Sequence, residues 1–180
     1  MATGFTITVQ DQAVQTALQA LLYRVNIMQP VLQTIGEGIV ERTKARFDTS
    51  TGPDGAPWAP NSAVTLAMLA QRLAGTKSNR KKNGDLNARG QRAYANKKIL
   101  VDSGFLRQQI VATASGSDLT VTATAKYAAI QQFGGQAGRG KKVTIPARPF
   151  LPIRQDGSLY PEEQEQLLDA INAYLAEGLE

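Results

Sequence analysis

The sequence predicts an α+β fold in which an antiparallel β-sheet packs against N-terminal and C-terminal helices. Three patterns lead to this prediction: apolar residues at helical spacing before residue 48, alternation of apolar residues with Thr at residues 119–124, and another helical stripe near the end. The chain has 180 residues, of which 42% are hydrophobic, so we expect one core and a single domain over residues 1–180.

The N-terminal region is predicted to be one strand followed by helix. Residues 5–10 alternate apolar and polar side chains with period two, which favours a half-buried strand. A helix should follow, because apolar residues then recur on one helical face: Val14, Leu18, Leu21, Leu22 and Val25. Pro30 disfavours helical geometry at Gln29 and suits the first turn of a helix reaching Phe47, so this region holds two helices or one kinked helix.

Turn-forming residues dominate residues 48–61, and Trp58 lies among them. A Trp between prolines packs over the edge of a core or, alternatively, anchors a subunit interface. Ser62 then suits the N-cap of a short helix with Leu66, Leu69 and Leu73 on one face.

Aliphatic residues become rare from Gly75 to Asn96, which predicts an exposed, flexible basic loop over residues 75–98 that orders on assembly. Against one Asp it carries eight basic residues: Lys77, Arg80, Lys81, Lys82, Arg89, Arg92, Lys97 and Lys98. Residues 155–180, in contrast, carry seven Asp and Glu and no Lys or Arg. The two segments have the charges to meet on neighbouring copies.

The second half of the chain is predicted to alternate short helices and strands. Asp102 and Ser103 offer caps for a helical turn, and a β-hairpin should span residues 109–124. A short helix from Tyr127 to Phe133 should end at the glycines that follow. Val143 to Ile145 should form the last strand, and Leu167, Leu168, Ile171, Tyr174 and Leu175 the inner face of the final helix.

Composition argues against an enzyme. The chain has no His and no Cys, which removes the commonest general base and metal ligand together with thiol chemistry. Residues 135–142 match the spacing of a phosphate-binding loop, but Lys142 replaces the hydroxyl residue and a strand is expected next, so we interpret them as a flexible basic loop. Glu162, Glu163 and Glu165 are interpreted as complementing a helix dipole. No catalytic residue, cofactor or metal is expected.

No membrane-spanning segment is expected, because the apolar stretches are interrupted by polar residues and fall short of about 20 residues. The N-terminus has no basic region followed by an apolar run, so no secretory signal is expected. We expect the protein to be made in a cytoplasm.

Four short motifs, in this order, resemble the phage virion morphogenesis family, which includes tail-completion proteins of Mu-like and P2-like phages. They are Phe47 with Pro53-Asp54-Gly55 and Trp58; Leu100 to Leu106; Tyr127-Ala128 with Gln132-Phe133-Gly134; and Ile145 to Leu151. The resemblance covers about 130 residues. The Arg148-Pro149-Phe150 segment has a stiff extended backbone, which suits either a subunit contact or a role in determining the fold.

The resemblance implies a structural virion subunit that completes the tail or the neck at the head-tail junction. Its partners would be copies of itself in a ring, expected to be a hexamer, and neighbouring tail-tube, tail-terminator or head-connector proteins. DNA would pass through the ring. Candidate subunit-interface residues are Trp58, Tyr127, Phe133, Arg148, Pro149 and Phe150. On this interpretation Arg148→Ala with Phe150→Ala harms assembly more than folding.

The alternative is a DNA-binding accessory protein. Contact with the phosphate backbone requires only positive charge and reach, which the basic loop has, and Arg139, Lys141 and Lys142 add to it. Tyr94 is the only aromatic residue of that loop, so base stacking and sequence-specific readout are not expected.

Overall fold

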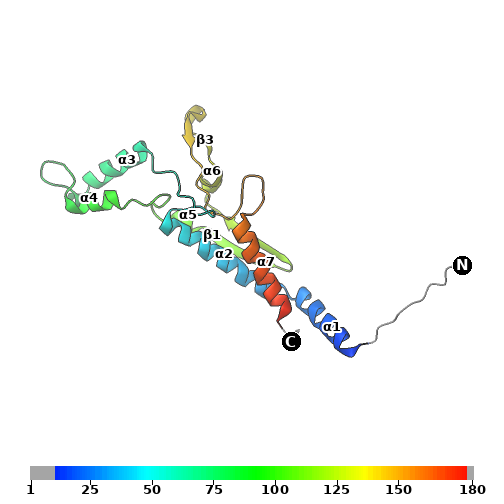
Figure 1. Cartoon of the computed structure of the whole chain (residues 1–180). Helices are drawn as coiled ribbons and strands as arrows, with labels where there is room; N and C mark the ends of the chain where they lie inside the picture. Colours follow the sequence, from blue (N-terminus) through cyan, green and yellow to red (C-terminus); the bar gives the residue numbers. More distant parts are fainter. Residues whose placement is uncertain (1–10, 178–180) are drawn as a thin grey trace.

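The long helix α2 (Gln29–Thr49) lies at the centre of the body, and the other elements of the body pack against it (Figure 1). The computed structural model describes residues 11–177, so the strand predicted for residues 5–10 lies outside the described residues. Pro30 occupies the first turn of α2, as predicted. The helix buries one side, including Leu32, Ile39 and Phe47, because the other elements of the body pack there.

A β-hairpin covers one side of α2. Strands β1 (Ile110–Ser115) and β2 (Asp118–Ala123) pair antiparallel from Ile110 opposite Ala123 to Ser115 opposite Asp118. This confirms the hairpin predicted for residues 109–124. Both strands contact α2, and Gly36 in the helix lets the hairpin approach closely.

The C-terminal helix α7 (Pro161–Ala176) lies beside α2 (Figure 1). Leu167, Ile171 and Tyr174 of the predicted inner face are partly buried, whereas Leu168 is 49% exposed. Mixed helix and strand with antiparallel pairing confirm the predicted α+β class.

Helix α1 (Gln12–Asn26) confirms the predicted N-terminal helix, but the rest of the protein does not cover its apolar stripe. Val14, Leu18, Leu22 and Val25 are 49%, 55%, 63% and 54% exposed. The helix contacts α7 near its own C-terminal end and projects away from the body (Figure 1).

A second projection, which we call the basic arm (residues 63–96), consists of α3 (Ala63–Ala74), the 3-10 turn η1 (Lys77–Asn79) and α4 (Ala88–Ala95). Ser62 accepts a hydrogen bond from the backbone of Thr65, as predicted for an N-cap. The structure differs from the predicted loop at residues 75–98, because α4 forms within it. Asn87 caps α4, and buried Gly90 lets α4 approach the backbone of Asn79.

A third projection, the β3–β4 arm (residues 135–145), is a short hairpin of β3 (Gly135–Ala137) and β4 (Val143–Ile145), joined by η2 (Arg139–Lys141). β4 was predicted and β3 was not. The arm follows α6 (Ala128–Phe133), which ends at Gly134 with a positive φ of 72°, as expected for a glycine terminator. No helix follows residues 135–142, so they lack the helix N-terminus that a phosphate-binding loop requires.

Candidate assembly surfaces

Aromatic side chains form the core at the C-terminal end of α2. Phe47 and Trp58 meet edge to face with ring centroids 5.4 Å apart, and Phe47 and Phe150 lie 5.5 Å apart. Phe47 and Phe150 are fully buried, and the Trp58 indole N–H donates to the carbonyl oxygen of Pro149 at 2.8 Å. This contact satisfies the one polar group of the indole inside the core.

Gln132 fastens the segment around Phe150 to α6. Its Oε1 accepts hydrogen bonds from the backbone N–H groups of Phe150 and Leu151, each at 2.9 Å. Its Nε2 donates to the carbonyl oxygens of Leu151 at 3.1 Å and Ile153 at 2.9 Å. One buried amide therefore satisfies four backbone groups of a segment without regular structure.

Arg148 also stabilises this segment, through hydrogen bonds to the turn after Trp58. Its guanidinium donates to the carbonyl oxygens of Ala59 and Pro60, each at 2.7 Å. The side chain is buried, and burial lowers the pKa of Arg148 from its usual value. These contacts tie the turn after Trp58 to the segment before Phe150.

The structure thus places Trp58, Arg148 and Phe150 in the core of the protein rather than on an accessible surface. The motifs containing them determine the fold, because they supply its aromatic cluster and its buried hydrogen bonds. The double variant Arg148→Ala with Phe150→Ala is therefore expected to unfold the protein, contrary to the prediction from sequence. Pro149 is partly buried, and its carbonyl is taken by Trp58.

Two of the predicted interface residues are accessible: Tyr127 is 45% exposed and Phe133 is 39% exposed. Tyr127 lines an open groove between the basic arm and the β3–β4 arm, together with Phe105 and Val143, which are 48% and 53% exposed. Sequence reasoning missed Phe105 and Val143. It assigned both to regular elements, where the exposure of an apolar side chain depends on tertiary packing.

Glu163 in the first turn of α7 forms a buried ion-pair cluster with two arginines of α2. Its carboxylate accepts from Arg42 at 2.9 Å and from Arg46, whose guanidinium also donates to the carbonyl oxygen of Phe150 at 2.9 Å. Burial acts to raise the pKa of Glu163, but the hydrogen bonds and positive charges of Arg42 and Arg46 outweigh it and hold the pKa below its usual value. The helix-dipole interpretation was therefore incomplete for Glu163.

Two residues of the predicted DNA-contact set have structural partners instead. Lys97 is largely buried, and its Nζ donates to the carbonyl oxygen of Val101 at 2.7 Å and to Asp102 at 2.8 Å. Asp102 also binds Arg72 of α3 at 2.9 Å, and these hydrogen bonds lower the pKa of Asp102 well below its usual range. Lys98 pairs with Asp48 at 2.8 Å. The pair of Arg72 with Asp102 joins the basic arm to the body, and the pairs of Lys97 and Lys98 hold the segment that follows the arm.

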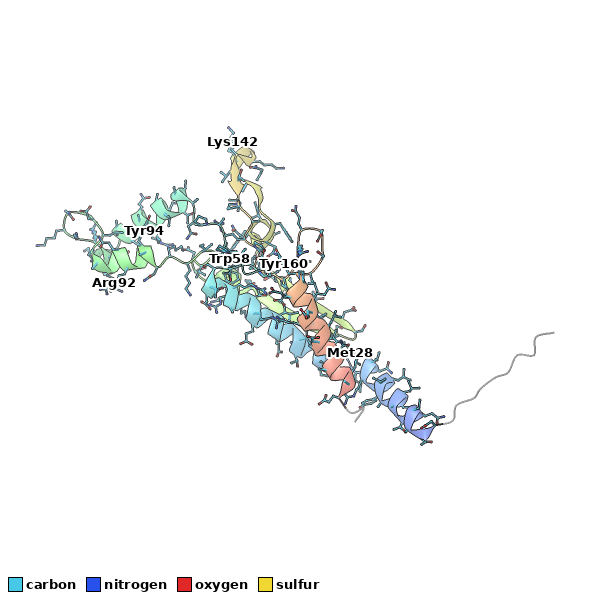
Figure 2. All side chains as sticks on the ribbon, in the orientation of Figure 1. Met28, Trp58, Arg92, Tyr94, Lys142 and Tyr160 are labelled. Carbon is cyan, nitrogen blue, oxygen red and sulfur yellow. The ribbon has the colours of Figure 1, made fainter. Side chains whose placement is uncertain are left out.

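The other basic residues project into solvent. Within residues 11–177, none of the following side chains forms an ion pair: Lys77, Arg80, Lys81, Lys82, Arg89, Arg92, Arg139, Lys141 and Lys142. The first six lie on the basic arm and the last three at the end of the β3–β4 arm. Figure 2 shows Arg92 and Lys142 on these two separate projections.

In residues 11–177, no three Asp, Glu, His or Cys side chains are grouped as metal ligands would be. No helix in the same range has the length and apolar character of a membrane span.

Comparison with known families shows which class of protein this is. The model of the phage virion morphogenesis family matches residues 9–176, and the chain belongs to this family. Its role is accordingly in phage virion morphogenesis. Among curated proteins, Mu-like prophage FluMu G protein 2 of Haemophilus influenzae is 43% identical over 75 residues, which is 42% of this chain and 50% of that protein. The match spans about half the length of that relative. No solved structure was found to match the chain.

Proposed function

We propose that the protein is a non-enzymatic structural subunit that completes the tail or neck at the head-tail junction of a tailed phage. It would act as one copy in a ring through which DNA passes, with the sixfold symmetry of phage tails. Neighbouring tail-tube, tail-terminator or head-connector proteins would contact the faces of the ring. Family membership supports the virion role, and the distribution of exposed surface supports a subunit that is completed by its neighbours.

One observation carries the proposal: the body is well packed, while its projections expose large apolar side chains. The core contains fully buried Phe47, Ile110 and Phe150, yet most of the apolar stripe of α1 is half exposed or more. An uncovered stripe of this kind contributes no free energy of burial to a free monomer. Contiguous exposed apolar surface commonly marks a contact with another protein. Assembly would cover it.

Cryo-electron microscopy of purified particles tests the proposal directly. We expect density for this protein as a closed ring at the head-tail junction, with six copies. Absence of the protein from mature particles would contradict the structural role, and density elsewhere in the particle would contradict the proposed location.

A second candidate function is contact with the phosphate backbone of passing DNA through the end of the β3–β4 arm. The observation that favours it is the exposure of Arg139, Lys141 and Lys142 together on one short projection. Such contact depends on charge alone, so affinity for duplex DNA should fall steeply with salt. Replacing all three residues by Glu should abolish this affinity, whereas Lys44→Glu on the body should not. Equal binding by both variants would contradict the contact.

A further inference from the structure

The two ends of the protein expose complementary surfaces. The first surface, which we call the α1 end, is the apolar stripe of α1, and the acidic outer face of α7 lies between it and the middle of the molecule. The second, the α3 end, combines an exposed apolar face of α3 with the charges of the basic arm. The two lie at opposite ends of the elongated molecule (Figure 1).

The α1 end offers a helix almost free of charge. Arg24 is the only charged residue within α1, and its guanidinium is turned toward α7, where it donates to the carbonyl oxygen of Tyr174. The stripe of Val14, Leu18, Leu22 and Val25 lies beside this contact and stays exposed. Depletion of charge around apolar side chains is typical of the centre of a protein-protein interface.

The outer face of α7 supplies negative charge nearer the middle of the molecule, toward the N-terminal end of α7 and away from its contact with α1 at Tyr174. Glu162, Glu165 and Asp169 are exposed and recur at helical spacing, on the side of α7 away from buried Glu163. Residues on this face have no ion-pair partner within residues 11–177.

The α3 end offers the counterpart. Val64 and Met68 are one helical turn apart on α3 and are 64% and 66% exposed. The neighbouring helix α4 packs against α3 and exposes Arg89 and Arg92. The apolar side chains and the positive charge of this end thus have separate counterparts, the apolar stripe of α1 and the negative charge on α7.

We propose that copies of this chain dock head to tail, with α1 and α7 of one copy on α3 and α4 of the next. A contact between different surfaces of identical chains closes into a ring when the rotation between copies permits, and it extends into a filament otherwise. The inference rests on the proposed ring and assigns its subunit interface. The basic arm then serves an acidic neighbour rather than DNA.

Engineered cysteines test this contact cleanly, because the natural chain has no Cys. Leu22→Cys and Met68→Cys are prepared as separate full-length proteins, mixed at high concentration and oxidised. We expect disulfide-linked pairs that contain one copy of each variant, with little crosslinking of either variant alone. Gln19→Cys, on the uncharged polar side of α1, is the matched control and should not crosslink to Met68→Cys. Efficient crosslinking of Leu22→Cys to itself would overturn the head-to-tail arrangement.

Charge reversal tests the electrostatic half of the interface. Arg89→Glu with Arg92→Glu, and separately Glu165→Lys with Asp169→Lys, should each weaken self-association by about tenfold or more, measured by sedimentation velocity at low salt. Mixing the two variants, or combining all four changes in one chain, should restore association. Failure of both rescues would overturn the pairing, and duplex DNA binding lost only with the arginine variant would assign the basic arm to DNA instead.

The two proposals fail separately. A ring in the particle without the Leu22 to Met68 crosslink would retain the proposed function and overturn this interface. Absence of the protein from particles would contradict the proposed function, whatever the purified protein does in solution.

Discussion

Gln132 shows how one side chain can hold an irregular segment in place. Its amide makes four hydrogen bonds to the backbone of residues 150–153, and it is 3% exposed. A substitution that keeps the volume and removes the hydrogen bonds leaves these backbone groups without partners, which is costlier than losing a bond at the surface.

We therefore expect Gln132→Leu to lower the free energy of unfolding by about 3 kcal/mol, measured by urea denaturation. Gln164→Leu, an exposed position on α7, is the control and should change it by less than about 0.5 kcal/mol. Equal effects of the two substitutions would show that the amide does not support the segment.

Glu163 makes the docking of α7 sensitive to acid. Because Arg42 and Arg46 hold its folded-state pKa below the usual 4.5, the unfolded chain binds this proton more readily. The stability from the cluster is therefore complete above the usual pKa and is lost as the pH falls through the lowered pKa.

At neutral pH, Glu163→Gln should lower the free energy of unfolding by roughly 3 kcal/mol, because it leaves buried Arg46 without its countercharge. The variant should also lose part of the acid dependence below the usual pKa of 4.5, measured by thermal unfolding at several pH values. Glu165→Gln, exposed on the same helix, should alter neither quantity by much. An unchanged pH profile for Glu163→Gln would contradict the role of the cluster.

At the scale of elements, the packing of α2 against the hairpin depends on one glycine. A Cβ atom at Gly36 would lie 2.8 Å from the Cβ of Ala112 and 2.6 Å from Cδ1 of Leu119. Ala112 is short and fixed on β1, so relief requires the hairpin to shift. Gly38, two residues later, has only the end of the Arg42 side chain near its Cβ position, at 3.4 Å.

The two glycines form a matched pair for mutation. Gly36→Ala should destabilise the protein by about 1–3 kcal/mol through overpacking, while Gly38→Ala should stabilise it by roughly 0.5–1 kcal/mol through helix propensity. Thermal or urea unfolding measures both. A stabilising Gly36→Ala would show that the hairpin does not pack closely on α2.

At the scale of the whole molecule, the body and the basic arm are joined by few contacts. Helices α3 and α4 and turn η1 contact one another, and the ion pair of Arg72 with Asp102 joins the arm to the body. Exposed ion pairs contribute little stability, so the body should fold without most of the arm.

Replacing residues 77–96 with a flexible linker of roughly ten residues should shift the midpoint of thermal unfolding by less than about 5 °C. Lys97 is kept, because its Nζ bonds to Val101 and Asp102 support the body. Replacing residues 110–123 with the same linker is the control and should abolish cooperative unfolding. Loss of cooperative unfolding in both variants would show that the arm belongs to the core.

Local patterns were sufficient for most elements. The stripes of α1, α2 and α7, the Ser62 cap and the alternation of residues 119–123 were all recognised, because each depends on neighbours within one or two turns of the chain. Helix α4 was missed because Ala, Arg, Gly and Gln at its positions provide no apolar stripe. Its position depends on contact with α3 and on the Asn87 cap.

The sequence by itself determined the α+β class, most helices, the first hairpin, the separation of charge and the family. Only the tertiary structure decided which residues are core and which are surface. Trp58, Arg148 and Phe150 are buried because distant segments converge on them. The stripe of α1 is exposed because, in residues 11–177, the main contact of that helix is with α7 and lies at one end. The spacing of apolar residues indicates that one face of a helix is apolar. What covers that face depends on contacts between residues far apart in the chain.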